Sequence, residues 1–171
     1  DAARDVPQAT FLINGDGAAR ASLEQRAAGL PNVRFSGYQP RLRVPEVLAT
    51  GDVHLVPLKQ GLGRVSVPSK TYSILAAGRP VLAAIDPDTE VPRMLAASGG
   101  GLAVPPDDPA AFVTALRQLL AEPAAAAAMG AAGREWVLGA ASPRAVAIAY
   151  EQLVRSLGSP RRRSAFGSTS R

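Results

Sequence analysis

The sequence predicts an α/β fold, a doubly wound parallel sheet closed by helices at the carboxyl-terminal end of the chain. Short apolar runs alternate with stretches whose apolar residues repeat at the period of a helix, the pattern of strands joined by crossover helices. One run, residues 81–85, is apolar without interruption, which is typical of a strand covered on both faces. With 171 residues and no cysteine, one domain without disulfides is expected.

The first half of the chain contains most of the predicted sheet. Gly29 and Gly78 are placed to end helices, because glycine readily adopts the left-handed conformation found there. Pro45 suits the first turn of a short helix that reaches Ala49. From these signals we expect strands at 9–13, 33–35, 52–56 and 81–85, and helices at 18–28, 45–49 and 67–77.

The second half is expected to hold one more short helix and strand, at 91–97 and 101–104, and then three helices. Asp108 and Ser142 each precede a proline, which is the pattern of an N-cap followed by a first-turn residue. Pro123 opens the helix between them, which runs to about residue 138. The apolar face of the first helix has Phe112, Ala115, Leu116, Leu119 and Leu120, and the last helix is expected to turn inward Val146, Tyr150, Leu153 and Leu157.

Charge separates a domain from a tail. Four of the 19 basic residues follow Leu157, leaving 15 against 14 acidic residues. We therefore predict a domain at 1–157 and a disordered basic tail at 158–171. The domain is nearly neutral and aromatic residues are only 5% of the chain, so nucleic acid is not an expected partner. No apolar run approaches the ~20 residues of a membrane span. The expected location is cytoplasmic, and the arginine run leaves peripheral contact with anionic lipid open.

Ligands of doubly wound sheets bind beyond the carboxyl ends of the strands, so the loops after residues 13, 35, 56 and 85 form the candidate site. The sequence contains no G-x-G-x-x-G and no Walker loop. Asp86-Pro-Asp88 has the spacing of a cation-binding pair, but Pro87 lies in a turn and no further ligand is near, so no metal is expected. His54 lies inside an apolar strand and is expected to be a core histidine rather than a catalyst.

Lys70 is one of only two lysines, and it falls in the first turn of a predicted helix. A cation there opposes the helix dipole, whereas a bound anion would meet both the free amides and the ammonium. A phosphate site at Lys70 explains this placement, and a lysine that is merely solvated is the alternative.

Several motifs occur in one order along residues 8–157, and together they resemble the carboxyl-terminal domain of a GT-B fold glycosyltransferase of the retaining family 4. The segment Pro68-Ser-Lys-Thr-Tyr72 is similar to a branch that builds cell-surface polysaccharides. The other motifs are Gly15-Asp-Gly17, Asn32-Val-Arg-Phe-Ser-Gly37, Ala49-Thr-Gly-Asp-Val53, residues 67–81, Thr89-Glu-Val91, Gly100-Gly-Leu-Ala-Val-Pro105 and Asp107-Asp-Pro109.

The resemblance implies that this domain holds a nucleotide-sugar donor, expected to be UDP-linked, for transfer to a polysaccharide or lipid-linked acceptor. Lys70 is the residue expected to act in catalysis, by stabilising the charge on the leaving diphosphate without a metal or cofactor. Among the expected donor-binding residues, Tyr38 lies at the base, and Gly61 and Gly63 belong to the loop that faces the sugar. Pro68, Ser69 and Lys70 belong to the turn at the pyrophosphate, with Ser66 and Thr71 on either side of it, and Ser73 or Glu90 binds the ribose.

The sequence also departs from the family pattern. Two glutamates that many members carry are matched by Val65 and Ser73, which weakens the expected ribose contact. The acceptor domain and the first strand and helix of the donor domain have no counterpart, so the chain is read as a truncated domain that is inactive alone. A membrane lipid is a further candidate acceptor. Two alternatives stay open, a non-catalytic α/β interaction domain and a GT-B epimerase-like domain, although the latter needs more histidines than the single one present.

Overall fold

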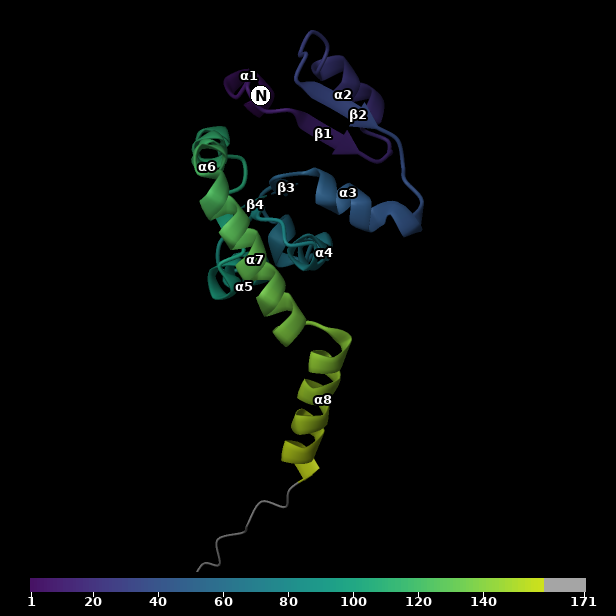
Figure 1. The fold of residues 1–171 in the computed structure, drawn as a ribbon, viewed down its shortest axis with the longest axis vertical. Helices are drawn as coiled ribbons and strands as arrows, with labels where there is room; N and C mark the ends of the chain where they lie inside the picture. The colour runs from purple at the N-terminus through teal and green to yellow at the C-terminus, as the bar shows by residue number, and fades with distance from the viewer. Residues whose placement is uncertain (159–171) are drawn as a thin grey trace, which may run out of the picture.

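The computed structural model describes residues 1–158, in which short strands alternate with helices (Figure 1). The strands are β1 (Phe11–Asn14), β2 (Val33–Ser36), β3 (His54–Pro57), β4 (Val81–Ala84) and β5 (Gly101–Val104). The helices are α1 (Ala2–Asp5), α2 (Arg20–Arg26), α3 (Val44–Thr50), α4 (Lys70–Ala76), α5 (Glu90–Ser98), α6 (Pro109–Ala121), α7 (Pro123–Ala140) and α8 (Pro143–Gly158), with 3₁₀ turns η1 (Arg41–Arg43) and η2 (Leu62–Arg64). Each predicted element is therefore present.

The strands form two parallel sheets rather than one continuous sheet. β1 pairs with β2, and separately β3, β4 and β5 pair in that order. In the larger sheet, Val81 lies opposite His54 on one side and Gly101 on the other. This confirms that the strand beginning at Val81 is central and parallel. In Figure 1 the two-stranded sheet lies above the larger one.

Helices cover both faces of the larger sheet, as a doubly wound fold requires. Val81, Ala83 and Ile85 contribute to one hydrophobic cluster, whereas Leu82 between them contributes to the other. This alternation follows from the two-residue period of a strand. The first cluster includes residues of α4, α5 and α7, and the second includes residues of α6 and Val6, which directly follows α1. Since Val81, Leu82 and Ala83 are fully buried, β4 anchors the loops at its carboxyl end.

The second cluster also joins the two sheets. Phe11 of β1 and Leu55 of β3 both pack against it. Nearby, the side-chain amide of Asn32 lies 2.8 Å from the carbonyl of Ala3 and 3.1 Å from that of Ala9, and it donates to both. Asn32 therefore ties the start of β2 to α1 and to the segment that leads into β1.

The predicted helix boundaries are confirmed where a specific residue sets them. The carboxylate of Asp108 accepts a hydrogen bond from the amide of Ala111 at 2.9 Å, which is the expected N-cap of α6. Gly78 has a φ of +71° after α4, as its predicted role requires. α4 itself begins at Lys70 rather than near Val67, because the preceding residues form a separate turn.

The last helix departs from the prediction. Val146, Tyr150, Leu153 and Leu157 were expected to face inward, but their exposed fractions are 40%, 66%, 54% and 77%. Figure 1 shows the reason: α8 extends away from the sheets, so its apolar stripe has no surface of the described chain to cover. The predicted tail at 158–171 lies outside the described residues except for Gly158, which ends α8. Within residues 1–158, no helix is both long and apolar enough to cross a bilayer.

Candidate functional site

The loop after β3 is held over the end of β4 by a carboxylate. Gly61 has a φ of +86°, and the 3₁₀ turn η2 follows it. Asp86, two residues after β4, accepts a hydrogen bond from the amide of Gly61 at 2.8 Å and another from the amide of Gly63 at 3.0 Å. Gly63 is buried because it lies against Ile85 and Asp86. The loop therefore depends on Asp86 for its shape.

A second carboxylate holds the start of the same loop. Asp107, which lies between β5 and α6, accepts a hydrogen bond from the amide of Gln60 at 3.1 Å. The amide of Leu58 in turn donates to the carbonyl of Ala84 at 2.8 Å, which extends the contact between β3 and β4. We call residues 59–64 the clamped loop, because acidic residues that follow β4 and β5 fix three of its amides.

These contacts favour the charged form of Asp86. The amide of Gly61 is the largest influence and holds the pKa of the Asp86 carboxyl below its ordinary value. Burial of this carboxyl raises its pKa, whereas the amide of Gly63 and the charge of Arg64 lower the pKa further. Asp86 is 4% exposed, and a buried carboxylate needs such partners to stay ionised.

The turn before α4 places Lys70 at the surface. Pro68 provides the carbonyl that accepts hydrogen bonds from the amide of Thr71 at 2.9 Å and from its hydroxyl at 2.8 Å. Thr71 is fully buried, so both of its donors hold this turn. Lys70, directly before it, is exposed as the first residue of α4. The turn therefore presents Lys70 and Ser69 to solvent and keeps Thr71 inside.

α4 and α5 meet beside this turn through Tyr72 and Glu90. Burial raises the pKa of the Tyr72 phenol, and the neighbouring Glu90 carboxylate raises it further through its charge and a hydrogen bond. Glu90 is exposed at the start of α5. The hydroxyl of Thr89 donates to the carbonyl of Asp86 at 2.7 Å, which fixes the approach to this helix. Glu90 and Lys70 thus lie on helices that both begin near the carboxyl end of β4.

The predicted base contact, Tyr38, lies in the loop after β2. It is 79% exposed. The side-chain amides of Asn14 and Gln39 both donate to the carbonyl of Gly37, at 3.1 and 3.2 Å. These bonds fix the backbone beside Tyr38 while its ring stays free. Tyr38 follows a strand of the two-stranded sheet, whereas the other predicted residues follow β3 and β4 of the larger sheet.

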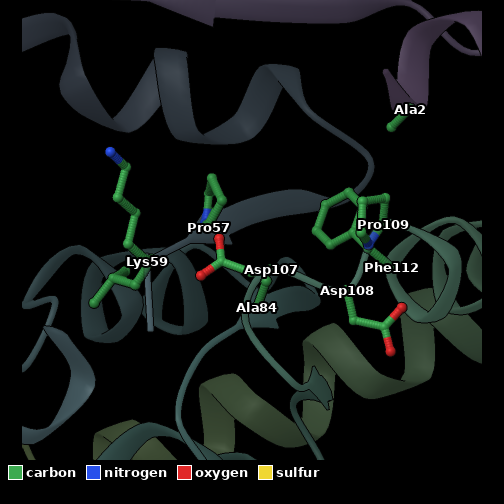
Figure 2. A pocket seen from close by; sticks show the side chains of 9 residues that line it. Ala2, Pro57, Lys59, Ala84, Asp107, Asp108, Pro109 and Phe112 are labelled. Atoms are coloured by element: carbon green, nitrogen blue, oxygen red, sulfur yellow. The ribbon is translucent and has the colours of Figure 1, made fainter. Parts of the chain in front are cut away.

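A cavity of about 260 Å³ opens at the carboxyl end of the larger sheet (Figure 2). None of the ten predicted donor-binding residues lines it. Figure 2 shows Asp107 and Phe112 on the sheet side and Ala2 of α1 across the opening. The cavity borders the clamped loop through Lys59. Its lining residues are Ala2, Pro57, Leu58, Lys59, Ala84, Asp107, Asp108, Pro109 and Phe112.

Three predicted residues have hydrogen-bond donors that are engaged within the protein. The amides of Gly61 and Gly63 already donate to Asp86, so they are not free to donate to a ligand. Thr71 is buried with both donors engaged. The amide of Ser66 also donates within the loop, to the carbonyl of Leu62 at 3.0 Å, although its side chain is exposed. The side chains that remain exposed or partly exposed are Tyr38, Ser66, Pro68, Ser69, Lys70, Ser73 and Glu90.

Sequence reasoning missed Asp86, Asp107 and Tyr72 as parts of this region. The signal for Asp86 was its place directly after a continuously apolar strand, but its spacing to Asp88 suggested only a metal pair. Its two amide contacts give it a structural partner instead. In the described part of the chain no three acidic or histidine side chains gather as metal ligands do.

His54 was expected to be a core histidine; it is half-buried rather than fully buried, and it makes a structural contact. Its Nε2 atom lies 2.8 Å from the carbonyl of Leu48. This contact joins the start of β3 to α3, at the end of the strand opposite to the clamped loop. The single histidine is therefore not in the candidate site.

Comparison with known proteins adds a family. The sequence profile of the family described as glycosyl transferases group 1 matches residues 1–122. A protein assigned as a glycosyltransferase, WbjE of Pseudomonas aeruginosa, is 33% identical over 114 residues, 66% of this chain and 28% of that protein. A protein assigned to colanic acid biosynthesis, WcaI of Escherichia coli, is 35% identical over 126 residues, 72% of this chain and 31% of that protein.

The name of a third relative includes its sugar donor. The GDP-mannose-dependent alpha-(1-6)-phosphatidylinositol monomannoside mannosyltransferase of Mycolicibacterium smegmatis is 32% identical over 146 residues, 79% of this chain and 36% of that protein. The chain thus spans about a third of the length of the curated relatives it matches.

Solved structures share the fold. A sucrose-phosphate synthase from Thermosynechococcus elongatus superposes with a TM-score of 0.75 at 27% identity, over 91% of this chain and 40% of that one. Anabaena HepE in complex with UDP superposes with a TM-score of 0.63 at 18% identity, over 88% of this chain and 41% of that one. The α/β class with parallel strands is therefore confirmed.

Proposed function

Because the chain belongs to the glycosyl transferases group 1 family, we propose that it is the nucleotide-sugar-binding part of a glycosyltransferase with the GT-B fold. The observation that carries this proposal is the convergence of the clamped loop, the turn before α4 and the start of α5 at the carboxyl ends of β3 and β4. Ligands of open parallel sheets bind at this edge.

Lys70 is the proposed contact for the diphosphate of the donor. Its ammonium is exposed at the start of α4, and the turn that presents it is held internally by Pro68 and Thr71. Transfer of the sugar leaves negative charge on the departing diphosphate, and a fixed cation stabilises that charge. Lys70 can therefore serve both donor binding and the chemical step, without a metal or cofactor.

Glu90 is the proposed contact for the ribose hydroxyls, because a carboxylate accepts hydrogen bonds from neighbouring hydroxyl groups. It is exposed, and its charge is close enough to the Tyr72 phenol to raise the pKa of that phenol. Ser73 is a weaker alternative on α4. Tyr38 has an exposed ring after β2 and is the proposed surface for the base.

For the donor we propose UDP-linked sugars, supported by HepE, whose structure is described in complex with UDP. The relative named as GDP-mannose-dependent makes GDP-linked sugars the competing outcome of the test. For the acceptor we propose a polysaccharide precursor or a lipid-linked glycan, in keeping with the relative assigned to colanic acid biosynthesis. We also propose that transfer retains the configuration at the sugar, as the resemblance of the sequence motifs to family 4 implies. For the location we propose the cytoplasm, with peripheral contact to the membrane when the protein meets such an acceptor.

The test is calorimetric titration of the purified chain with UDP, GDP and the sugar nucleotides UDP-glucose and GDP-mannose. We expect one nucleotide class to bind with a dissociation constant near 1 mM or below, which corresponds to a favourable binding free energy of about 4 kcal/mol or more. No sugar transfer is expected from the isolated chain, because transfer requires the acceptor to be held in line with the donor. The proposal would be overturned if neither the uridine nucleotides nor the guanosine nucleotides bind.

A further inference from the structure

We propose that Asp86 is a positioning residue for the sugar of the donor, and that it acts by setting which atoms of the clamped loop face the ligand. The proposal rests on the proposed function, since it assigns one part of the nucleotide-sugar to one part of that site. It does not make Asp86 a catalytic residue, because its carboxylate faces the loop rather than solvent.

Both the side chain and the backbone of Asp86 are held by hydrogen bonds. Its carboxylate accepts the two amide hydrogen bonds from Gly61 and Gly63, at 2.8 and 3.0 Å. Its carbonyl accepts the hydroxyl of Thr89 at 2.7 Å. β4 ends at Ala84 and is fully buried over its first three residues. The backbone of Asp86 is therefore fixed by β4 and by Thr89, independently of the loop that its carboxylate holds.

The clamped loop has a conformation that needs such a partner. Gly61 has a φ of +86°, and Gly63 has no room for a β-carbon. The amides of Gln60, Gly61 and Gly63 all point at carboxylates of the protein. Without an acceptor of two hydrogen bonds at Asp86, two of these amides would lose their partners, and the loop would be free to adopt other shapes.

Because those amides point at carboxylates and the carbonyls of Lys59, Gly61 and Leu62 accept hydrogen bonds within the segment, the groups that the loop offers to a ligand are its exposed polar side chains. Lys59, Gln60 and Arg64 are exposed there. These groups can donate to and accept from the hydroxyls of a sugar, and their positions follow the loop backbone. Asp86 therefore controls contacts to the sugar from behind the loop.

The diphosphate contact does not depend on Asp86. The turn that presents Lys70 is held by the two hydrogen bonds from Thr71 to Pro68. Removing the Asp86 carboxylate leaves those bonds in place. The clamped loop and the turn before α4 are thus held by different hydrogen bonds, so we expect loss of Asp86 to weaken contacts to the sugar and to spare those to the nucleotide.

The test compares Asp86→Asn with Asp88→Asn. Asparagine at position 86 keeps one acceptor oxygen but presents an NH₂ group to the second amide. Asp88 is exposed in the same turn with a φ of +60°, a conformation that asparagine also tolerates, so Asp88→Asn removes the same charge without touching the loop. Calorimetry then measures the affinity of each variant for UDP and UDP-glucose, and for GDP and GDP-mannose.

In Asp86→Asn we expect the affinity for the sugar nucleotide to fall about tenfold and the affinity for the matching nucleoside diphosphate to change less than twofold. Asp88→Asn should match the unchanged chain for both ligands. If Asp86→Asn loses affinity equally for both ligands, Asp86 has a general structural role and the assignment is overturned. The assignment is also overturned if the variant loses affinity for neither ligand.

Amide hydrogen exchange followed by NMR gives a readout that needs no ligand. In the unchanged chain the amides of Gly61 and Gly63 should be protected, and in Asp86→Asn at least one should exchange about tenfold faster. If the unchanged chain binds no nucleotide, the proposed function and the sugar assignment both fail, although this measurement would still show the clamp. If the chain binds nucleotide but these amides exchange equally in both proteins, the assignment alone fails.

Discussion

A β-carbon built on Gly63 would lie 2.8 Å from Cγ1 of Ile85. It would also lie 3.1 Å from Oδ2 of Asp86, the atom that accepts the hydrogen bond from the Gly63 amide. The clamped loop thus passes so close to the end of β4 that only glycine fits at this position. The shape of the loop and the packing of the central strand are therefore coupled.

Gly63→Ala should lower the free energy of unfolding by about 1–3 kcal/mol, the usual cost of an extra methyl group in a packed site. Urea unfolding followed by circular dichroism measures it. The matched control is Gly17→Ala, because a β-carbon at Gly17 meets no atom within 4 Å. Equal stability of the two variants would mean that the loop lifts away from Ile85 at little cost.

The contribution of Asp86 to stability should depend on pH in a definite direction. Its folded pKa is lowered, chiefly by the amide of Gly61, so the stabilisation is fully present above the unfolded value of about 3.9. It is lost as the pH falls through the lowered value. Urea midpoints of the unchanged chain and of Asp86→Asn should differ by a constant amount from about pH 7 to 5 and converge below about pH 4. A gap that stays constant down to pH 3 would contradict this.

Lys70→Ala should weaken binding of the nucleoside diphosphate about tenfold or more, because a hydrogen bond from a charged group contributes about 1.5–3 kcal/mol. Folding should be unchanged, since the Lys70 side chain is exposed. Calorimetry measures the affinity, and Arg93→Ala, on the exposed surface of α5, controls for the loss of one positive charge. Unchanged affinity in Lys70→Ala would remove Lys70 from the site.

Local patterns in the sequence predicted most of the fold because local interactions set it. Asp108 before Pro109 predicted the start of α6, and the run from Val81 predicted the central strand. The stripe of α8 was misjudged because periodicity shows that a helix has an apolar side but not what that side contacts. The clamp was missed because Asp86 and Gly61 are 25 residues apart in sequence, and only the register of β3 against β4 brings them together.

Gly130→Ala tests how closely α7 packs on the rest of the fold. A β-carbon at Gly130 would lie 2.2 Å from the carbonyl oxygen of Gly78, a backbone atom that cannot rotate away. We expect a loss of about 1–3 kcal/mol in the free energy of unfolding. Gly139→Ala in the same helix is the control, because no atom lies within 4 Å there. Equal unfolding midpoints for the two variants would show that α7 shifts freely.

We propose that a nucleotide binds at the carboxyl ends of β3 and β4. Titration of the isotope-labelled chain with UDP, followed by the chemical shifts of its backbone amides, tests this most directly, with GDP in a parallel series. We expect saturable shifts concentrated in residues 59–70 and 86–90, with smaller shifts near Tyr38 and none in α8. Shifts confined to other parts of the chain, or no saturable shift with either nucleotide, would contradict it.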